Sequence, residues 1–245
     1  MAAEGKTMDA LSQFELTPIV AGFSNSNFYM LIAGVAISAL MLIGMQPRAR
    51  VPGRLQSLAE VSYEFIYGLV RDQIGHEGKK FFPFVFTLFM FILFGNMLGM
   101  LPYAFTFTSH IAVTFTLALV VFILVTAVAL AIHGLHFFSY FFPEGAPKAL
   151  APLIIPIEII SYLSRVVSLS VRLFANMVAG HVMLKVFATF IVMMGGAGAI
   201  GLLGALAPLA INVALVGFEF LVAFLQAYVF AVLTCIYLHD AVHLH

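Results

Sequence analysis

The sequence predicts an all-α, polytopic membrane protein with five transmembrane helices and one amphipathic interfacial helix. Two observations point to this fold class: an extreme composition and five long apolar stretches. Of the 245 residues, 63% are hydrophobic and 9% are charged, and the mean hydropathy is +1.10. A soluble domain carries roughly 25% charged residues. Most of the surface of this chain must therefore face lipid or other protein.

The five apolar stretches are long enough to span a membrane as helices. They lie at 28–45, 81–103, 111–138, 153–194 and 209–238. Crossing about 30 Å of hydrocarbon takes about 20 helical residues. A membrane barrel would instead show short segments that alternate between apolar and polar residues. Residues 1–27 are polar and lack the features of a signal peptide. We expect them to form an external segment ahead of a single membrane domain, 28–245.

The segment 52–75, between the first two stretches, has a different pattern. Apolar residues such as Leu55, Leu58 and Phe65 recur at helical spacing, with charged residues such as Glu60 between them. This pattern is typical of an amphipathic helix. We expect it to lie at the membrane surface or to pack against another subunit.

The distribution of positive charge predicts the orientation of the chain. Six Lys and Arg residues lie between the first two spans: Arg48, Arg50, Arg54, Arg71, Lys79 and Lys80. Lys148 lies between the third and fourth spans, and Lys6 is alone on the opposite side. Cytoplasmic loops carry the excess of Lys and Arg. The N-terminus is therefore expected outside and the C-terminus in the cytoplasm.

The fourth stretch is too long for one upright span. A helix over 153–194 would be about 60 Å long at about 1.5 Å per residue. It must either tilt strongly or break near Pro156 or Gly180. We favour one strongly tilted helix, because tilt accommodates excess length and no proline follows Pro156 in the stretch.

Two polar stripes interrupt the last two stretches. The fourth stretch carries polar residues at steps of three and four, which share one helix face. These residues are Glu158, Ser161, Arg165, Ser168, Arg172 and Asn176. The fifth stretch carries Asn212, Glu219 and Gln226 at intervals of seven. Two such helices indicate a hydrated path or a polar helix–helix contact. Arg165 itself is expected to be an interfacial charge.

A glycine-rich segment between these stretches predicts a tilted helical hairpin centred near residue 199 or 200. This centre places Arg172 level with Gln226, and His181 level with Glu219. From the predicted orientation, His181 and Glu219 lie toward the outer face of the membrane. Glu158 lies toward the inner face.

Arg172 is the most costly residue of the chain. A charged group at this depth costs at least about 2.5–3.5 kcal/mol on insertion scales. Unlike lysine, arginine cannot lose its charge by deprotonation. An ion pair with Glu219 is one explanation, but the register separates the two by seven residues, or about 10 Å along the helix axis. We therefore expect a partner subunit to supply the counter-charge.

Three sequence blocks resemble the a subunit of the rotary F-type ATP synthases. Residues 168–177, SLSVRLFANM, followed by Ala179, Gly180 and His181, resemble the arginine motif of that family. The block GNMLGMLP at 95–102 is similar to the same family. So is the segment from Glu219 to the sequence YLHD at 237–240. The resemblance extends from about residue 46 to the C-terminus.

The resemblance implies a non-catalytic, proton-translocating stator subunit of the Fo sector in a bacterial inner membrane. The expected partners are a ring of c subunits, the b subunits of the peripheral stalk and, indirectly, the F1 sector. No cofactor, metal or nucleic acid is expected, and no residue makes or breaks covalent bonds. Proton flow through two half-channels would then be coupled to ATP synthesis.

The resemblance also implies roles for individual residues. Arg172 is the essential cation facing the ring, and His181 with Glu219 forms the outer half-channel. The order of this His/Glu pair is the mitochondrial one, whereas many bacterial members have the two exchanged. The other expected site residues are Glu158 and Ser168 in the inner half-channel, Asn176, Asn212 and Gln226 as ligands of water or Arg172, and Asn96. Asn96 could equally bind a neighbouring helix.

Two other classes of protein remain as alternatives. A secondary transporter or proton antiporter could use Arg172 and Glu219 as its substrate site. Such transporters usually contain repeated halves with broken helices, and this sequence shows no internal repeat. A purely structural membrane scaffold would have no use for an arginine at mid-membrane depth.

Overall fold

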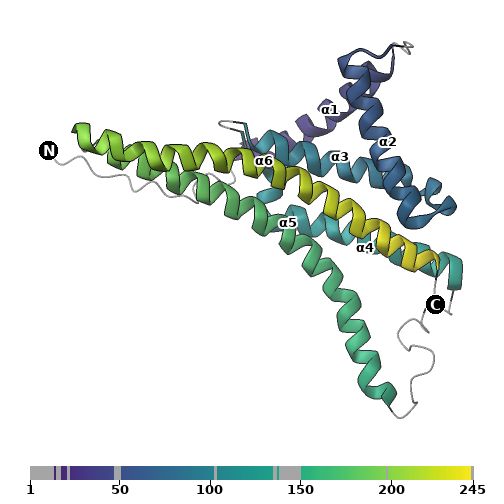
Figure 1. Ribbon diagram of the computed structural model, residues 1–245. Coiled ribbons are helices and arrows are strands. Elements are labelled where there is room, and N and C mark those ends of the chain that lie inside the picture. The colour runs from purple at the N-terminus through teal and green to yellow at the C-terminus, as the bar shows by residue number, and fades with distance from the viewer. Residues whose placement is uncertain are drawn as a thin grey trace.

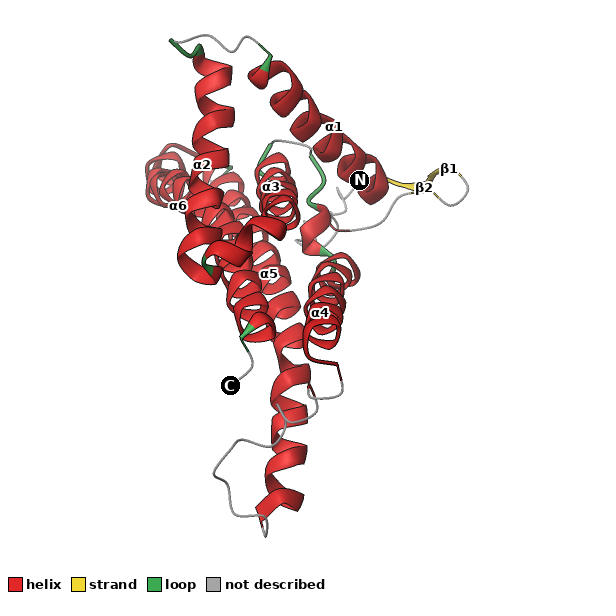
Figure 2. Cartoon of the chain, turned by 90° about the vertical axis from the view of Figure 1, so that its right-hand side faces the viewer, coloured by secondary structure: helices red, strands yellow, loops and turns green. Residues whose placement is uncertain are grey.

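The computed structural model describes residues 14, 18–20, 23–46, 51–101, 104–134, 137, 150–196 and 198–243. Within these ranges the chain is almost entirely helical (Figures 1 and 2). The exceptions are loops and a short antiparallel pair of strands, β1 (Pro18–Val20) and β2 (Phe23–Ser24), directly before the first helix.

Six α-helices lie in the described ranges. They are α1 (Asn25–Met45), α2 (Arg54–Ile74), α3 (Phe82–Gly99), α4 (Ile111–His133), α5 (Ala151–Gly195) and α6 (Gly198–Val242). Short 3-10 helices η2 (His76–Lys80) and η3 (Phe107–Ser109) precede α3 and α4. By length and composition, every helix except α2 could cross a membrane. The predicted fold class, with five spans and one amphipathic helix, is confirmed.

The third span is shorter than predicted because a glycine ends it. The apolar run continues to Phe138, but α4 stops at His133, and Gly134 follows with φ +57°. Only glycine adopts this backbone region readily, and it commonly follows a helix C-terminus. The second span also stops early, at Gly99 rather than 103. Residues 104–110 turn back and pack against α3, α4 and α5.

The fifth span is longer than predicted. Glycines at 198, 201 and 204, together with Pro208, were expected to form a loop, yet α6 already begins at Gly198. Glycine weakens a helix in water, but an apolar segment beside another helix satisfies its backbone best as a helix. Gly204 also allows close packing, since a Cβ there would lie 2.6 Å from Cε of Met194.

Helix α5 is continuous through both Pro156 and Gly180, as predicted. Its 45 residues extend about 68 Å at about 1.5 Å per residue. Figure 1 shows that this helix bends near its middle. Ser164 donates a hydrogen bond to the carbonyl of Ser161, and Ser170 donates one to that of Val167. Such back-bonding from serine often bends helices.

The core lies where α3, α4, α5 and α6 meet. Phe89, Val121, Leu173 and Phe230, one from each of these helices, are buried in a single apolar cluster. Helix α5 packs along α6, and α3 and α4 pack against this pair. Helices α1 and α2 diverge from the bundle in Figure 2. The long hairpin of α5 and α6 therefore has a rigid support on one side.

Helix α2 leaves part of its apolar stripe exposed. Leu55 and Leu58 are exposed. Phe65 contacts the rings of Phe89 and Phe224, and Ile66 is buried. An apolar face that the chain itself leaves uncovered fits lipid or a second protein. The predicted amphipathic helix is present, and its apolar side is available for such a contact.

We expect Gly95→Ala to destabilise the core, because a Cβ at this position would collide with the buried ring of Phe107. Overpacking of this kind costs about 1–3 kcal/mol. A lower unfolding temperature of the purified protein would show it. Gly68→Ala is the matched control, because a Cβ on Gly68 meets nothing within 4 Å. Equal stability of the two variants would contradict this description of the core.

Candidate functional site

The hairpin of α5 and α6 brings His181 and Glu219 together, as the predicted register requires. Nδ1 of His181 lies 3.6 Å from Oε1 of Glu219. Both side chains are largely enclosed, with 12% and 4% of their surfaces exposed. Neither carboxylate oxygen has a hydrogen-bond partner among the described residues. A buried carboxylate placed in this way is suited to exchanging a proton with its neighbour.

Gly180 makes this approach possible. A Cβ on Gly180 would lie 2.6 Å from Oε1 of Glu219, well inside van der Waals contact. The glycine directly before His181 thus lets the carboxylate of α6 reach the surface of α5. Its place in the sequence block around Arg172 has a steric reason.

Arg172 lies on the exposed side of α5. Leu169, Leu173 and Met177 are buried against the neighbouring helices, whereas Arg172 is exposed. It forms no ion pair or hydrogen bond with any residue that the structure describes. The alternative of an internal ion pair with Glu219 is therefore not what the structure contains. The guanidinium faces outward, away from the core of the chain.

The other predicted site residues lie along the same two helices. On α5, Ser168 is exposed, and Glu158 and Asn176 are half-buried. On α6, Asn212 and Gln226 are half-buried, and the Oδ1 atom of Asn212 is buried without a hydrogen-bond partner in the described residues. These side chains leave a discontinuous polar surface along an otherwise apolar hairpin.

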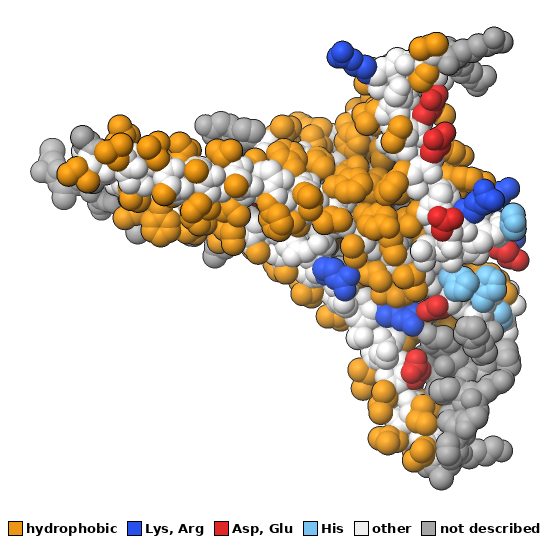
Figure 3. Space-filling view, viewed as in Figure 1, with side chains coloured by type: hydrophobic (Ala, Val, Ile, Leu, Met, Phe, Trp, Pro, Cys, Tyr) orange, Lys and Arg blue, Asp and Glu red, His pale blue; other side chains and the backbone are white. Residues whose placement is uncertain are grey.

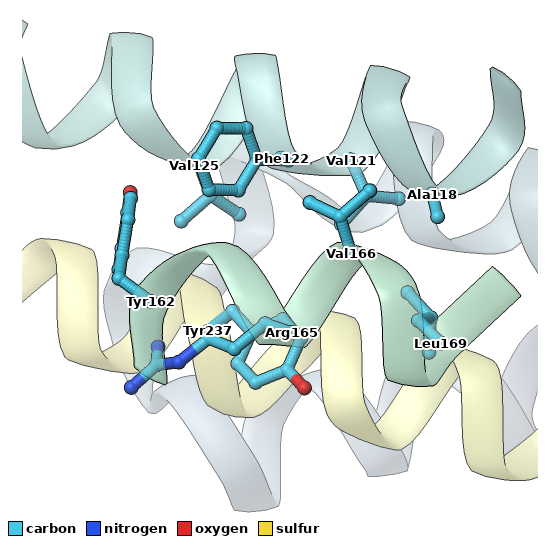
Figure 4. A pocket seen from close by; sticks show the side chains of 9 residues that line it. All are labelled: Ala118, Val121, Phe122, Val125, Tyr162, Arg165, Val166, Leu169 and Tyr237. Atoms are coloured by element: carbon cyan, nitrogen blue, oxygen red, sulfur yellow. The ribbon is translucent and has the colours of Figure 1, made fainter. Parts of the chain in front are cut away.

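Arg165 leaves the polar stripe and binds α6 instead. Its Nη1 lies 3.2 Å from Oδ2 of Asp240, in an ion pair that remains partly exposed. Its guanidinium also lies 4.9 Å from the ring centre of Tyr237 and 5.6 Å from that of Tyr162. Figure 4 shows Arg165 with Tyr162 and Tyr237 at the small cavity between α4, α5 and α6. Arg165 thus joins α5 to the C-terminal part of α6.

Asn96 connects three elements. Its Nδ2 donates a hydrogen bond of 3.1 Å to the carbonyl of Ala223 on α6, and Thr108 donates one of 2.8 Å to its Oδ1. Asn96 and Thr108 are both fully buried. Of the two roles considered for Asn96, the structure contains the bond to a neighbouring helix. This residue fixes η3 against α3 and α6.

One polar contact of the site was missed by the sequence interpretation. Oγ1 of Thr106 lies 2.9 Å from Nε2 of His181. A threonine in the short segment between two spans carries no distinctive pattern, so nothing in the sequence indicated this contact. His110 lies in the same segment, and burial lowers the pKa of its ring, which stacks on Phe105.

Charged side chains are unevenly distributed on the face of the molecule shown in Figure 3. On the face shown in Figure 3, the arm that ends at the turn between α5 and α6 carries no charged side chain. Charged side chains gather on the opposite half of the molecule. Within the described ranges, no three His, Cys, Asp or Glu side chains lie close enough to hold a metal ion.

The fold and the site define a class: a polytopic membrane protein whose polar helical hairpin carries an enclosed His/Glu pair and an arginine that is unpaired among the described residues. The sequence model of the family described as ATP synthase A chain matches residues 27–239. The chain therefore belongs to this family.

Full-length relatives support the same assignment. The chain is 66% identical to ATP synthase subunit a of Granulibacter bethesdensis over 252 aligned residues, which cover all of both chains. It is 57% identical to ATP synthase subunit a of Acidiphilium cryptum, covering 99% of this chain and 100% of the relative. The protein of the same name from Gluconacetobacter diazotrophicus is 58% identical, covering 98% and 99%.

Proposed function

We propose that the chain conducts protons past a rotating ring of c subunits, with Arg172 as the fixed cation that faces the ring. As a member of its family, the chain is a non-catalytic, proton-translocating component of the membrane sector of an ATP synthase. The observation that carries the proposal is the position of Arg172. It is exposed in the middle of an apolar helix and unpaired with any described residue.

A permanent cation in this position needs a counter-charge outside the chain. A ring carboxylate that passes Arg172 would be stabilised in its ionised form by the guanidinium, since an opposite charge at close range favours the charged state. The carboxylate would release its proton before the contact and take up another after it. Arg172 would also repel protons and so prevent a direct leak between the two sides.

His181 and Glu219 form the outer proton path. Their side chains are enclosed and 3.6 Å apart, so a proton can pass between them with small movements. Histidine changes its charge near neutral pH and is suited to this exchange. Asn212 lies two helical turns from Glu219 on the same face of α6, where its buried amide oxygen can hold water.

Glu158 and Ser168 form the inner proton path on the same helix. Glu158 and His181 are 23 positions apart, or about 35 Å along α5, which is close to the thickness of the hydrocarbon layer. Arg172 lies between them. Its position divides the hairpin into two paths that reach opposite sides of the membrane, with Asn176 and Gln226 close to the division.

The proposed setting is the inner membrane of a bacterium, with residues 1–27 and the N-terminus in the periplasm and the C-terminus in the cytoplasm. Each proton that crosses 100 mV supplies about 2.3 kcal/mol to turn the ring, and F1 receives this energy indirectly. The exposed part of the apolar stripe of α2, with Leu55 and Leu58, is the proposed contact for the b subunits.

Disulfide cross-linking tests whether this face of α5 meets the ring. We expect Ser168→Cys to form a disulfide with a cysteine placed beside the ring carboxylate, because Ser168 is exposed one turn from Arg172. Ser170→Cys is the matched control, because Ser170 is 1% exposed on the opposite face. The native Cys235 is also buried.

Cross-linking that is absent at Ser168, or equal at both serines, would contradict the proposed orientation of α5. A second experiment, transport by the purified chain, distinguishes this proposal from a transporter that works alone. Purified without a ring, it would still carry its substrate, whereas this chain should conduct protons only with the ring present.

A further inference from the structure

We propose that Thr106 is a positioning residue of the outer proton path, where its hydroxyl changes between hydrogen-bond donor and acceptor as His181 loses and gains its proton. This inference rests on the proposed role of His181 and Glu219. It adds a third group, from a different part of the chain, to that pair.

The two ring nitrogens of His181 have different partners. Nδ1 faces Oε1 of Glu219 at 3.6 Å, and Nε2 faces Oγ1 of Thr106 at 2.9 Å. In the neutral ring, one nitrogen carries a proton and the other accepts one, and in the cation both are donors. A carboxylate is best matched by a proton on Nδ1. Nε2 then accepts a hydrogen bond from the threonine hydroxyl.

A hydroxyl group can serve both protonation states without moving. When Nε2 is unprotonated, the Thr106 hydroxyl donates to it. When His181 becomes a cation, the hydroxyl hydrogen rotates away and the oxygen accepts from Nε2. A carbonyl could only accept in this position and a lysine could only donate. The ring of His181 therefore keeps its orientation toward Glu219 throughout the proton transfer.

The surroundings of Thr106 hold this hydroxyl in place. Ser109 donates a hydrogen bond of 2.6 Å to the carbonyl of Thr106. Thr108, two residues after Thr106, donates a hydrogen bond to Asn96 of α3, which in turn donates one to α6. Thr106 itself is 5% exposed. The segment between α3 and α4 is thus tied to the same helix that carries Glu219.

Gly99 is the steric condition for this arrangement. A Cβ on Gly99 would collide with the side chain of Thr106. Gly180 has the same role beside Glu219, because a Cβ on Gly180 would collide with that carboxylate. A glycine thus leaves room for each of the two side chains, Thr106 and Glu219, that lie next to His181. Close approach from α3 and α5 places Thr106, His181 and Glu219 in one row.

The test measures passive proton flux through the assembled membrane sector in vesicles stripped of F1. We expect Thr106→Val, which keeps the shape and removes the hydroxyl, to slow the flux about tenfold, the effect of losing one hydrogen bond in the rate-limiting step. Thr106→Ser restores the hydroxyl and should conduct like the parent. Rescue by serine separates the hydroxyl's role from packing of the methyl group.

Thr234→Val is the matched control. Thr234 is fully buried on α6 and donates its hydroxyl hydrogen bond to the carbonyl of Phe230 in its own helix. The proton flux of the Thr234→Val variant should therefore equal that of the parent. Thr106→Ala replaces the valine variant if that variant does not assemble. Flux that is normal in the valine or alanine variant overturns the inference, as does slow flux in the serine variant.

A His181→Gln variant distinguishes a failure of this inference from a failure of the proposed function on which it rests. His181→Gln is measured beside the threonine variants. If His181→Gln blocks the flux and Thr106→Val conducts normally, Thr106 has no positioning role and the proton path stands. If His181→Gln also conducts normally, the proposed path itself is wrong.

Discussion

Arg172→Gln should abolish both ATP synthesis and ATP-driven proton pumping, while the subunit still assembles in the membrane. Glutamine fills a similar volume and can form hydrogen bonds, but it cannot stabilise the ionised form of a ring carboxylate. It also cannot repel a proton, so the barrier between the two paths would be lost. Pumping is measured by fluorescence quenching in inverted membrane vesicles, and synthesis is measured with an imposed proton gradient.

Two substitutions sharpen this experiment. Arg165→Gln makes the same chemical change two turns earlier on α5, where the side chain pairs with Asp240 in a partly exposed ion pair. Such a pair contributes about 0–1 kcal/mol, so this variant should still pump. Arg172→Lys keeps a cation that can deprotonate when buried and should fall between the parent and Arg172→Gln. Normal pumping by Arg172→Gln would show that the cation is dispensable.

The second large effect is expected at the His/Glu pair. Glu219→Gln removes the carboxylate that lies 3.6 Å from His181 and should lower passive proton flux about 100-fold or more, the range over which a positioned acid or base acts. The amide occupies the same space, so assembly should be unaffected. Flux in F1-stripped vesicles, normalised to the amount of assembled subunit, is the measurement.

Exchanging the two residues provides the control. His181→Glu and Glu219→His should each block the flux, because the first leaves two carboxylates and the second leaves two imidazoles. The double variant restores one of each, in the exchanged order. It should conduct more than either single variant. A double variant that is no better than the single ones would show that position, as well as chemistry, decides the role of each group.

The helical architecture and the pairing across the hairpin were predictable because both follow from the regular geometry of the α-helix. Five apolar stretches implied five spans, and the glycine-rich centre implied the register that places His181 against Glu219. That contact depends only on counting residues from a turn. The structure contains it at 3.6 Å.

Other features depend on tertiary contacts that leave no periodic pattern in the sequence. Arg165 shares the spacing of Arg172, yet the two differ because Asp240 forms an ion pair with Arg165. Thr106 enters the site only because the segment after α3 folds back onto α5. The helix limits at Gly134 and Gly198 were also missed, since the same residue type ends one helix and begins another.

The outward position of Arg172 also bears on how the cell handles newly made copies of this chain. Before a partner is present, the guanidinium lies against lipid, at a cost of at least about 2.5 kcal/mol on insertion scales. An unassembled copy is therefore less stable than an assembled one, and partial withdrawal of α5 from the bilayer relieves the cost. We therefore expect unassembled copies to be degraded by membrane proteases faster than assembled ones. The charge that would drive the motor thus also limits the lifetime of any copy that fails to find its place.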